Sequence, residues 1–330
     1  MKRSKRFVSE VLTTLKDNIQ STGDPLGMKE VYWASWAKDL NLPRQGDTVL
    51  LTGRMYQMLP YIMQVTKIIS SARPFLSRSG FGAFVNMGNR LMGDKVIRFR
   101  ALGASAMKKK SREVLQGIVS ALSAAGSIPA YLYEDDPYSG VLLYDLGLDA
   151  YIKEHIKKVY HVLKDHKVNR VICVDPHTTF MLRKVYPAHI DHFDIEVRHY
   201  LEILSENADL LGDSCTNPLN KEYVIHDSCY LTRELSVVEQ VRRVAGSIGI
   251  TLREPGNAKL DTSCCGGPIE YAFQDLTEKV SRARMQELAV ISRDIIVECP
   301  ICLINLSKYE KEMGVKVWDM GELLHEACKT

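Results

Sequence analysis

The sequence predicts an α/β protein made of two pseudo-repeated βαβ halves with mainly parallel sheets. Short runs rich in β-branched residues alternate with longer stretches of helical periodicity. Apolar strands separated by helices are typical of βαβ units, in which the strands pair in parallel. The same order of elements recurs further along the chain, which indicates two related halves.

The composition is that of a globular protein with a sizeable core. Hydrophobic residues make up 45% and charged residues 25% of the 330 residues, a length that favours two domains. These values exclude a disordered chain, a fibre and a small disulfide-stapled scaffold. The net charge of +3 does not favour a nucleic-acid partner, and no nucleic-acid motif accompanies it, so we expect no nucleic acid.

No segment is predicted to span a membrane. The most apolar stretch, residues 55–69, contains Pro60, Gln64 and Lys67, whereas a spanning helix needs roughly 20 mostly apolar residues. Polar residues also interrupt the basic N-terminal segment, where a signal peptide would need an apolar core. We therefore expect a cytoplasmic protein.

The elements follow in a regular order. Residues 1–47 are predicted to form a helical lead segment, with helices over Ser4–Ile19 and Val31–Leu40. The predicted strands are Thr48–Thr52, Ile128–Tyr133, Arg170–Val174, Ile195–Arg198, Tyr223–His226, Thr251–Arg253, Asp294–Glu298 and Val315–Trp318. Predicted helices between them include Tyr151–Asp165, Tyr230–Ala245, Ile269–Ile291 and Leu303–Met313.

Two parts of the chain can be aligned with each other. Residues 168–178 match 292–302, because each is a strand followed by a proline at a helix start, and residues 195–204 match 315–324. We therefore expect a first α/β half over residues 48–212 and a second half over 213–330.

The first half contains a basic insertion at residues 71–112. It holds ten Lys and Arg residues against one acid, Asp94, with aromatic and aliphatic residues between them. One interpretation is a solvated helical excursion. The other is a docking surface for a partner subunit or for anionic lipid, which would place the protein peripherally on a membrane.

Five of the eight cysteines form a pattern. They occur as Cys229, then Cys264-Cys265-Gly266-Gly267-Pro268, then Cys299-Pro300-Ile301-Cys302. Each group follows a predicted strand, and the carboxyl ends of parallel strands meet at one edge of a sheet. In a reducing cytoplasm such a pattern indicates metal or redox chemistry more often than disulfides. Cys173, Cys215 and Cys328 lie outside the pattern and are expected to be structural.

The local chemistry favours thiolates at these positions. Pro300 suits the first turn of a helix, so Cys299 and Cys302 are expected at a positive helix N-terminus. Gly266 and Gly267 allow a tight turn and a close approach of backbone N–H groups to sulfur. Four thiolates suffice for zinc or for a cubane iron–sulfur cluster, so the residues leave both open, beside buried thiols without metal.

The second half resembles a known family. The segments His226–Arg233, Cys264–Pro268, Cys299–Cys302 and Trp318–Leu324 are similar to the cysteine-rich CCG domain found in the B and D components of heterodisulfide reductase. Related domains occur in iron–sulfur subunits of glycolate, lactate and glycerol-3-phosphate oxidoreductases. The resemblance implies the architecture of the B component. It also implies a noncubane [4Fe–4S] cluster, held by Cys229, Cys264, Cys265, Cys299 and Cys302, that handles disulfide chemistry.

The first half keeps the frame of this family without its cysteines. Gly53-Arg54 stands in place of Gly-Cys, Tyr138-Ser139-Gly140 in place of Cys-Cys-Gly, and Asp175-Pro176-His177-Thr178 in place of Cys-Pro-x-Cys. We therefore expect no metal at the first site. Asp175, His177 and Arg54 could form either a polar substrate pocket or a structural network.

Three polar residues near the second site are candidates for catalysis. His226, with Asp227 beside it, could donate a hydrogen bond to a sulfur or a proton to a leaving thiolate. Arg233 could neutralise the charge of a cluster. The structural alternatives are a packed pair at a strand end and a solvated helix arginine.

Three functions follow from these features. The first is an oxidoreductase subunit of a heterodisulfide-reductase-like complex, with a disulfide or thiol substrate. The second is an electron-transfer subunit of a membrane-associated respiratory dehydrogenase without disulfide chemistry, and the third is a zinc-stabilised assembly module. One cluster cannot relay electrons over a distance, so the first two imply partner subunits that carry flavin or iron–sulfur centres.

Overall fold

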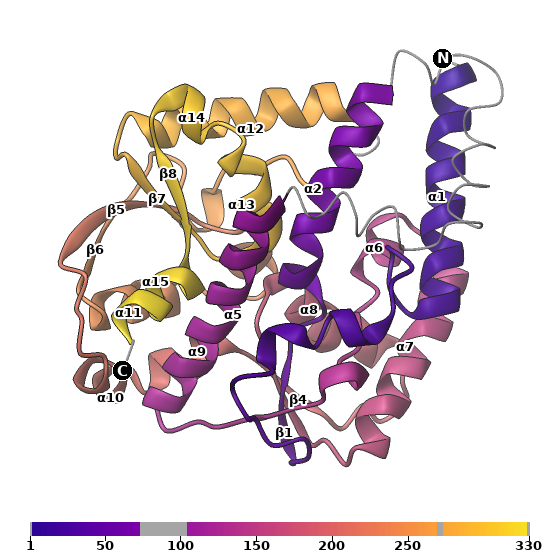
Figure 1. Cartoon of the computed structure of the whole chain (residues 1–330), viewed down its shortest axis with the longest axis horizontal. Helices are drawn as coiled ribbons and strands as arrows, with labels where there is room; N and C mark the ends of the chain where they lie inside the picture. Colours follow the sequence, from indigo (N-terminus) through magenta and orange to yellow (C-terminus); the bar gives the residue numbers. More distant parts are fainter. Residues whose placement is uncertain (1, 73–103, 269–272, 329–330) are drawn as a thin grey trace.

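Two four-stranded parallel sheets form the frame of the protein, as the computed structural model shows (Figure 1). The structure describes residues 2–72, 104–268 and 273–328. The strand order is β2-β1-β3-β4 in the first sheet and β6-β5-β7-β8 in the second, and all the strand pairs are parallel. The identical order confirms the predicted α/β class of two repeated halves.

All eight strands lie where the sequence predicts them. The first sheet contains β1 (Thr48–Leu51), β2 (Ala130–Tyr131), β3 (Arg170–Cys173) and β4 (Glu196–His199). The second contains β5 (Lys221–His226), β6 (Ile250–Arg253), β7 (Asp294–Val297) and β8 (Lys316–Asp319). The central strands read as continuous apolar runs because helices cover both of their faces.

Helices fill the connections between the strands. Those of the first half are α1 (Lys2–Thr22), α2 (Met55–Ala72), α5 (Ser105–Ala124), α6 (Val141–Asp145), α7 (Asp149–Asp165), α8 (Pro176–Phe180), α9 (Tyr200–Glu206) and α10 (Ala208–Ser214). Those of the second half are α11 (Glu239–Ser247), α12 (Gln274–Ala289), α13 (Pro300–Ser307), α14 (Glu310–Met313) and α15 (Met320–Ala327). A π-helical turn, η7 (Tyr230–Glu234), follows β5.

The equivalent helices of the two halves, α8 and α13, each begin with a cap residue followed by a proline. Asp175 caps α8, because its Oδ1 accepts the N–H groups of His177 and Thr178 at 2.9 and 3.0 Å. Pro176 follows in the first turn, where its missing N–H costs nothing. In the second half Cys299 and Pro300 take these two places at the start of α13. A capping carboxylate and a cysteine therefore occupy one position of the repeated frame.

The two halves pack closely through helices α5 and α15, which Figure 1 shows beside each other. Gly117 of α5 lies against the backbone of Gly321 and His325 in α15. The Tyr56 hydroxyl donates to Asp319 Oδ2 at 2.8 Å, and Lys110 Nζ donates to the Val317 carbonyl at 2.6 Å. Helices of the first half thus cover the second sheet.

Three helix predictions were wrong in detail. Two short 3₁₀ turns, η1 (Glu30–Tyr32) and η2 (Ser35–Ala37), replace the helix expected at 31–40. The stretch 230–245 is divided because Ser236 adopts a φ of 58°, which no helix allows. The stretch 303–313 is likewise divided between α13 and α14. Of the helix expected at 269–291, α12 covers the part from Gln274, and residues 269–272 lie outside the described ranges.

Most of the basic insertion also lies outside the described ranges, since residues 73–103 are not among them. The described part begins α5, where Lys110 forms an ion pair with Glu322 at 3.0 Å. Lys110 is therefore part of the packing between the halves. The division at residues 212 and 213 falls inside α10 and stays a prediction.

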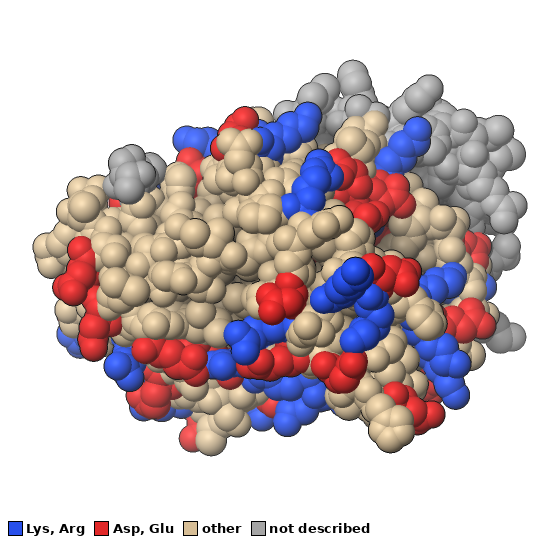
Figure 2. Space-filling view, turned by 90° about the horizontal axis from the view of Figure 1, so that it is seen from below, with Lys and Arg blue, Asp and Glu red and all other residues tan. Residues whose placement is uncertain are grey.

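Among the described residues, the face seen in Figure 2 mixes Lys and Arg with Asp and Glu around a broad uncharged area. Within the described ranges, every helix is too short or too polar to cross a bilayer.

Candidate metal centre

Five cysteines meet at the carboxyl edge of the second sheet. Cys229 follows β5, and Cys299 and Cys302 begin α13 directly after β7. Cys264 and Cys265 come from the loop between β6 and α12. Cys265, Cys299 and Cys302 are buried, whereas Cys229 and Cys264 are half-buried, so one side of the group faces outward.

The five sulfurs form a continuous chain of contacts, in the order Cys229, Cys264, Cys265, Cys302, Cys299. Hydrogen bonds from Cys229 and Cys265 hold the pKa of Cys264 far below its usual range, which favours the thiolate form. Burial raises the pKa of Cys299, but the hydrogen bond from Cys302 and the neighbouring His177 lower it further, which makes Cys299 a second thiolate. Hydrogen bonds to the neighbouring sulfurs raise the pKa of Cys229, Cys265 and Cys302, so the negative charge gathers on the other two sulfurs.

Backbone geometry at Gly266 supports the thiolate of Cys264. The Gly266 N–H donates to Cys264 Sγ at 3.2 Å. Gly266 has a φ of +89°, and a Cβ there would lie 2.8 Å from the Thr277 carbonyl oxygen. Only glycine fits this position without strain. Gly267 precedes Pro268 through a cis peptide bond.

His226 directs a donor nitrogen at the sulfurs. A ring nitrogen of His226 and the sulfurs of Cys265 and Cys302 lie within 4.8 Å of one another. The Arg284 guanidinium donates from Nε to His226 Nδ1 at 3.0 Å. Arginine has no acceptor, so Nδ1 must be unprotonated and Nε2 carries the ring proton. Burial first and Arg284 second lower the pKa of His226 to about 3, which keeps the ring neutral.

This tautomer makes His226 a hydrogen-bond donor and not a metal ligand. Ligation through Nε2 would require the proton to move to Nδ1, where it would face the N–H of Arg284. Nε2 has no other partner among the described residues and is buried. A buried N–H without a partner is costly, and the neighbouring sulfurs of Cys265 and Cys302 are its natural acceptors.

Asp227 anchors the loop that carries the cysteine pair. Its Oδ1 and Oδ2 accept from Arg242 at 2.5 and 2.8 Å, and Oδ2 also accepts the Lys259 N–H at 2.7 Å. Burial would raise the pKa of Asp227, but Arg242 lowers it further. Both carboxylate oxygens are therefore occupied by structural partners, and a part in proton transfer stays a prediction.

Arg233 lies on the turn after Cys229 and binds the same loop. Its Nε donates to the Leu260 carbonyl at 3.0 Å, and its Nη2 donates to the Thr262 carbonyl. These bonds fix the chain just before Cys264. Neutralisation of a cluster charge by Arg233 stays a prediction.

A polar network occupies the place of the missing cysteines in the first half. Arg54 Nε donates to the Asp136 carbonyl at 2.7 Å, and Arg54 Nη1 lies 3.7 Å from Asp24 Oδ2. The Thr52 hydroxyl donates to the Asp136 carboxylate. Arg54, Asp24 and Asp136 are all buried, and a Cβ on Gly53 would collide with the Thr178 hydroxyl. The geometry favours the structural network over the substrate pocket.

A histidine of the first half reaches the cysteines of the second half. His177 Nδ1 lies 3.8 Å from Cys299 Sγ, although 122 residues separate the two in sequence. Spacing along the chain gives no signal for this contact. It could only have been found from the repeat, which places His177 next to the lost ligand positions.

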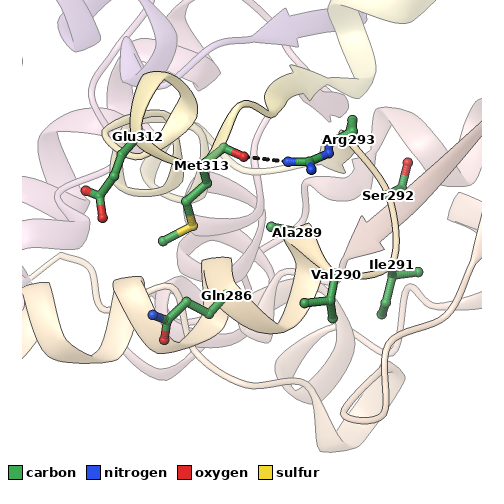
Figure 3. A pocket seen from close by; sticks show the side chains of 8 residues that line it. All are labelled: Gln286, Ala289, Val290, Ile291, Ser292, Arg293, Glu312 and Met313. Carbon is green, nitrogen blue, oxygen red and sulfur yellow. Dashed lines mark hydrogen bonds between the residues drawn. The ribbon is translucent and has the colours of Figure 1, made fainter.

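The remaining cysteines lie elsewhere. Cys173 is buried in β3, as expected for a core thiol. Cys215 and Cys328 form a disulfide that links the end of α10 to the end of α15. A hollow of about 720 Å³ lies between α12 and α14 (Figure 3). Arg293 and Met313 line it, and no cysteine or histidine is among its lining residues in the described chain.

The donor set fits a thiolate-bound metal group. The five sulfurs in contact are one more than the four that a zinc site uses. The N–H groups of Gly266 and His226 are available as hydrogen-bond donors to these sulfurs. Sulfur ligands of this kind select zinc, Cu(I) or iron–sulfur clusters.

Comparisons with known proteins agree with this arrangement. Residues 223–307 match the sequence model of the CCG cysteine-rich domain. The chain is also 27% identical over 240 residues to a protein of Syntrophomonas wolfei subsp. wolfei named EtfAB:quinone oxidoreductase. The match covers 68% of this chain and 33% of that relative, so the chain spans about a third of its length. The matched domain contains all five clustered cysteines, and we conclude that residues 223–307 belong to the CCG cysteine-rich domain family.

Proposed function

We propose that this protein is an iron–sulfur redox subunit in which Cys229, Cys264, Cys265, Cys299 and Cys302 hold one [4Fe–4S] cluster. The unbroken contact chain of five sulfurs at one sheet edge carries this proposal. The fifth sulfur favours a noncubane cluster, because a cubane needs only four. Zinc would also leave one sulfur unused.

When bound, such a cluster supplies one-electron redox chemistry. The chain's own residues prepare the site for it. The N–H groups of Gly266 and His226 are placed to stabilise negative charge on the sulfurs, and Arg284 adds a buried positive charge behind His226. Asp227 and Arg233 fix the loop before Cys264, so the sulfurs need little rearrangement on binding.

Electron transfer between partner subunits is the role that the relative supports. The relative is named as a quinone oxidoreductase, and this chain spans about a third of it, which leaves room for further redox groups there. By analogy we propose that this chain exchanges electrons with partners that carry flavin or iron–sulfur centres. The basic insertion stays a candidate surface for such a partner or for a membrane.

Thiol and disulfide chemistry is the second candidate function. The specific observation in its favour is His226 Nε2, a buried N–H beside Cys265 and Cys302 without a partner among the described residues. Its N–H could donate a hydrogen bond to the thiolate that leaves when an S–S bond is reduced by two electrons, while solvent supplies the protons. In that step two electrons and two protons would convert one disulfide into two thiols, and the partner subunits would supply the electrons.

Metal analysis after strictly anaerobic purification tests the proposal. About four iron and four sulfide per chain are expected, together with an electron paramagnetic resonance signal after reduction or oxidation. C265S is expected to lose iron and signal, whereas the matched control C173S, with its cysteine in the first sheet, should keep both. One zinc without sulfide would overturn the redox proposal and favour an assembly module.

Addition of a thiol to the oxidised sample separates the two redox roles. A changed resonance signal would favour disulfide chemistry, because the thiol would then bind at the cluster. An unchanged signal at full iron content would favour electron transfer alone.

A further inference from the structure

We infer that His177, a residue of the cysteine-free half, is a positioning residue for the metal centre of the other half. It donates a hydrogen bond to Cys299 and thereby raises the reduction potential of the bound cluster. This inference rests on the proposed iron–sulfur function. The cysteine-free half then contributes to the redox site across the interface.

The contact between the two residues is direct and dry. His177 Nδ1 lies 3.8 Å from Cys299 Sγ, within reach of an N–H···S hydrogen bond. His177 is 3% exposed and Cys299 is 1% exposed. Water therefore cannot replace the imidazole as the donor without opening the interface between the halves.

Two acceptors face the same ring nitrogen. Besides Cys299 Sγ, the Asp175 Oδ1 atom lies 3.7 Å from His177 Nδ1. A carboxylate and a thiolate can only accept hydrogen bonds, so Nδ1 carries a proton. The donor is thus present at the atom that faces the sulfur.

The ring is held in place from several sides. Asp175 is fixed because it caps α8 through the N–H groups of His177 and Thr178. The Tyr230 ring packs on the imidazole, with 4.5 Å between centroids, and the Tyr230 hydroxyl donates to Asp145 at 2.8 Å. Tyr230 directly follows Cys229, so the ring that packs on the imidazole belongs to the segment that carries one of the clustered cysteines.

The repeated frame shows what is unusual about this histidine. The alignment of residues 168–178 with 292–302 places His177 opposite Ile301. In the second half this position, between Cys299 and Cys302, carries an apolar side chain. In the first half the ligand positions are Asp175 and Thr178, and the residue between them carries a donor that reaches the other site.

The expected effect follows from charge. Reduction adds a negative charge to the cluster and its sulfurs, and an N–H donor stabilises the reduced form more than the oxidised form. Removal of the donor should shift the reduction equilibrium about tenfold toward the oxidised form, which is about 59 mV for one electron.

Redox titration followed by electron paramagnetic resonance on the intact chain tests this. H177L removes the donor, and H177N keeps an N–H near the place of Nδ1, whereas H177Q places its amide near Nε2. We expect H177L and H177Q to lower the midpoint potential at unchanged iron and sulfide content, and H177N to restore it. H155L serves as the control, because His155 is a buried histidine of the same half that bonds the Tyr138 carbonyl and no cysteine.

The outcomes separate the two proposals. An unchanged potential in H177L with full iron content would overturn the role of His177 and leave the proposed function intact. The same holds if H155L lowers the potential as much as H177L does. If the wild-type chain contains no iron and sulfide, the proposed function itself fails. If H177L loses its iron, the midpoint potentials of H177N and H177Q are compared instead. Equal potentials in these two variants would refute the inference.

Discussion

The contact between helices α5 and α15 gives a sharp prediction, because it depends on a missing side chain. A Cβ on Gly117 would press into the Gly321 carbonyl oxygen and would lie 2.6 Å from the His325 nitrogen and 2.7 Å from the His325 Cβ. Ordinary carbon contacts begin near 3.5 Å, so the His325 contacts alone would require the helices to separate by roughly 0.8 Å, and the closer Gly321 oxygen would require more. The nearest obstacles are backbone atoms, which cannot move aside independently.

The size of the effect can be estimated for G117A. Overpacking costs about 1–3 kcal/mol, and the rigid neighbours place this site at about 3 kcal/mol. Alanine in a helix recovers at most about 1 kcal/mol relative to glycine. We therefore expect the free energy of unfolding to fall by about 2 kcal/mol.

G246A is the matched control. Gly246 also lies in a helix, α11, but a Cβ there would meet no atom within 4 Å. We expect it to raise the free energy of unfolding by roughly 0.5 kcal/mol. Urea denaturation followed by circular dichroism measures both variants. If G117A is as stable as the wild type, the close packing of the two halves through α5 and α15 is refuted.

Three further predictions concern separate sites. G266A should lose most of its iron, because φ at Gly266 is +89° and the new Cβ would lie 2.8 Å from the Thr277 carbonyl oxygen. Iron analysis after anaerobic purification checks this prediction, and full iron content would contradict it. Burial raises the pKa of Asp136 to about 6 from 3.8, so its protonated form stabilises the fold below pH 4 and this contribution is lost as the pH rises through 6. In urea titrations, the free energy of unfolding of the wild type relative to D136N should thus fall by roughly 2–3 kcal/mol between pH 4 and pH 8. If the two proteins show the same dependence of this free energy on pH, the raised pKa of Asp136 is refuted. C328S should lower the free energy of unfolding by about 2–4 kcal/mol, because it removes the disulfide to Cys215, which spans 113 residues. A thiol assay of the denatured, unreduced wild type should find six free thiols. Eight free thiols would show that the disulfide is absent.

The strands and the cysteine group could be predicted because each depends on local sequence. Runs such as Val49–Leu51 and Ile295–Val297 are apolar throughout, as is typical of buried parallel strands. Cys229 and Cys299 closely follow buried strands, so the strand positions also placed their sulfurs at one edge, and Cys264 and Cys265 reach it from the longer loop after β6. Pro300 located the start of α13 for the same local reason.

The errors arose where tertiary contacts override local preference. The stretch 31–40 has the composition of a helix, but Trp33 and Trp36 are both drawn into the core, and Trp33 Nε1 donates to buried Asp24 at 3.3 Å. Two short 3₁₀ turns place both indoles there. Ser236, with a positive φ, divides the next long helix and carries no strong breaker signal in the sequence.

The surroundings of the site could not be predicted, since they come from distant parts of the chain. Arg284 meets His226 across 58 residues and thereby decides which ring nitrogen holds the proton. His177 meets Cys299 from the other half. A sequence shows that such residues exist, but only the packing of α8 and α12 against the second site gives them partners.

The pairing of α5 with α15 also sets an order of events on the ribosome. About 200 residues separate the two helices, so their synthesis is about 10–40 s apart. During that interval the glycine face of α5 has no partner, and all five clustered cysteines emerge before residues 320–327 can close over it. The nascent chain therefore presents its sulfurs while the interface between the halves is still open.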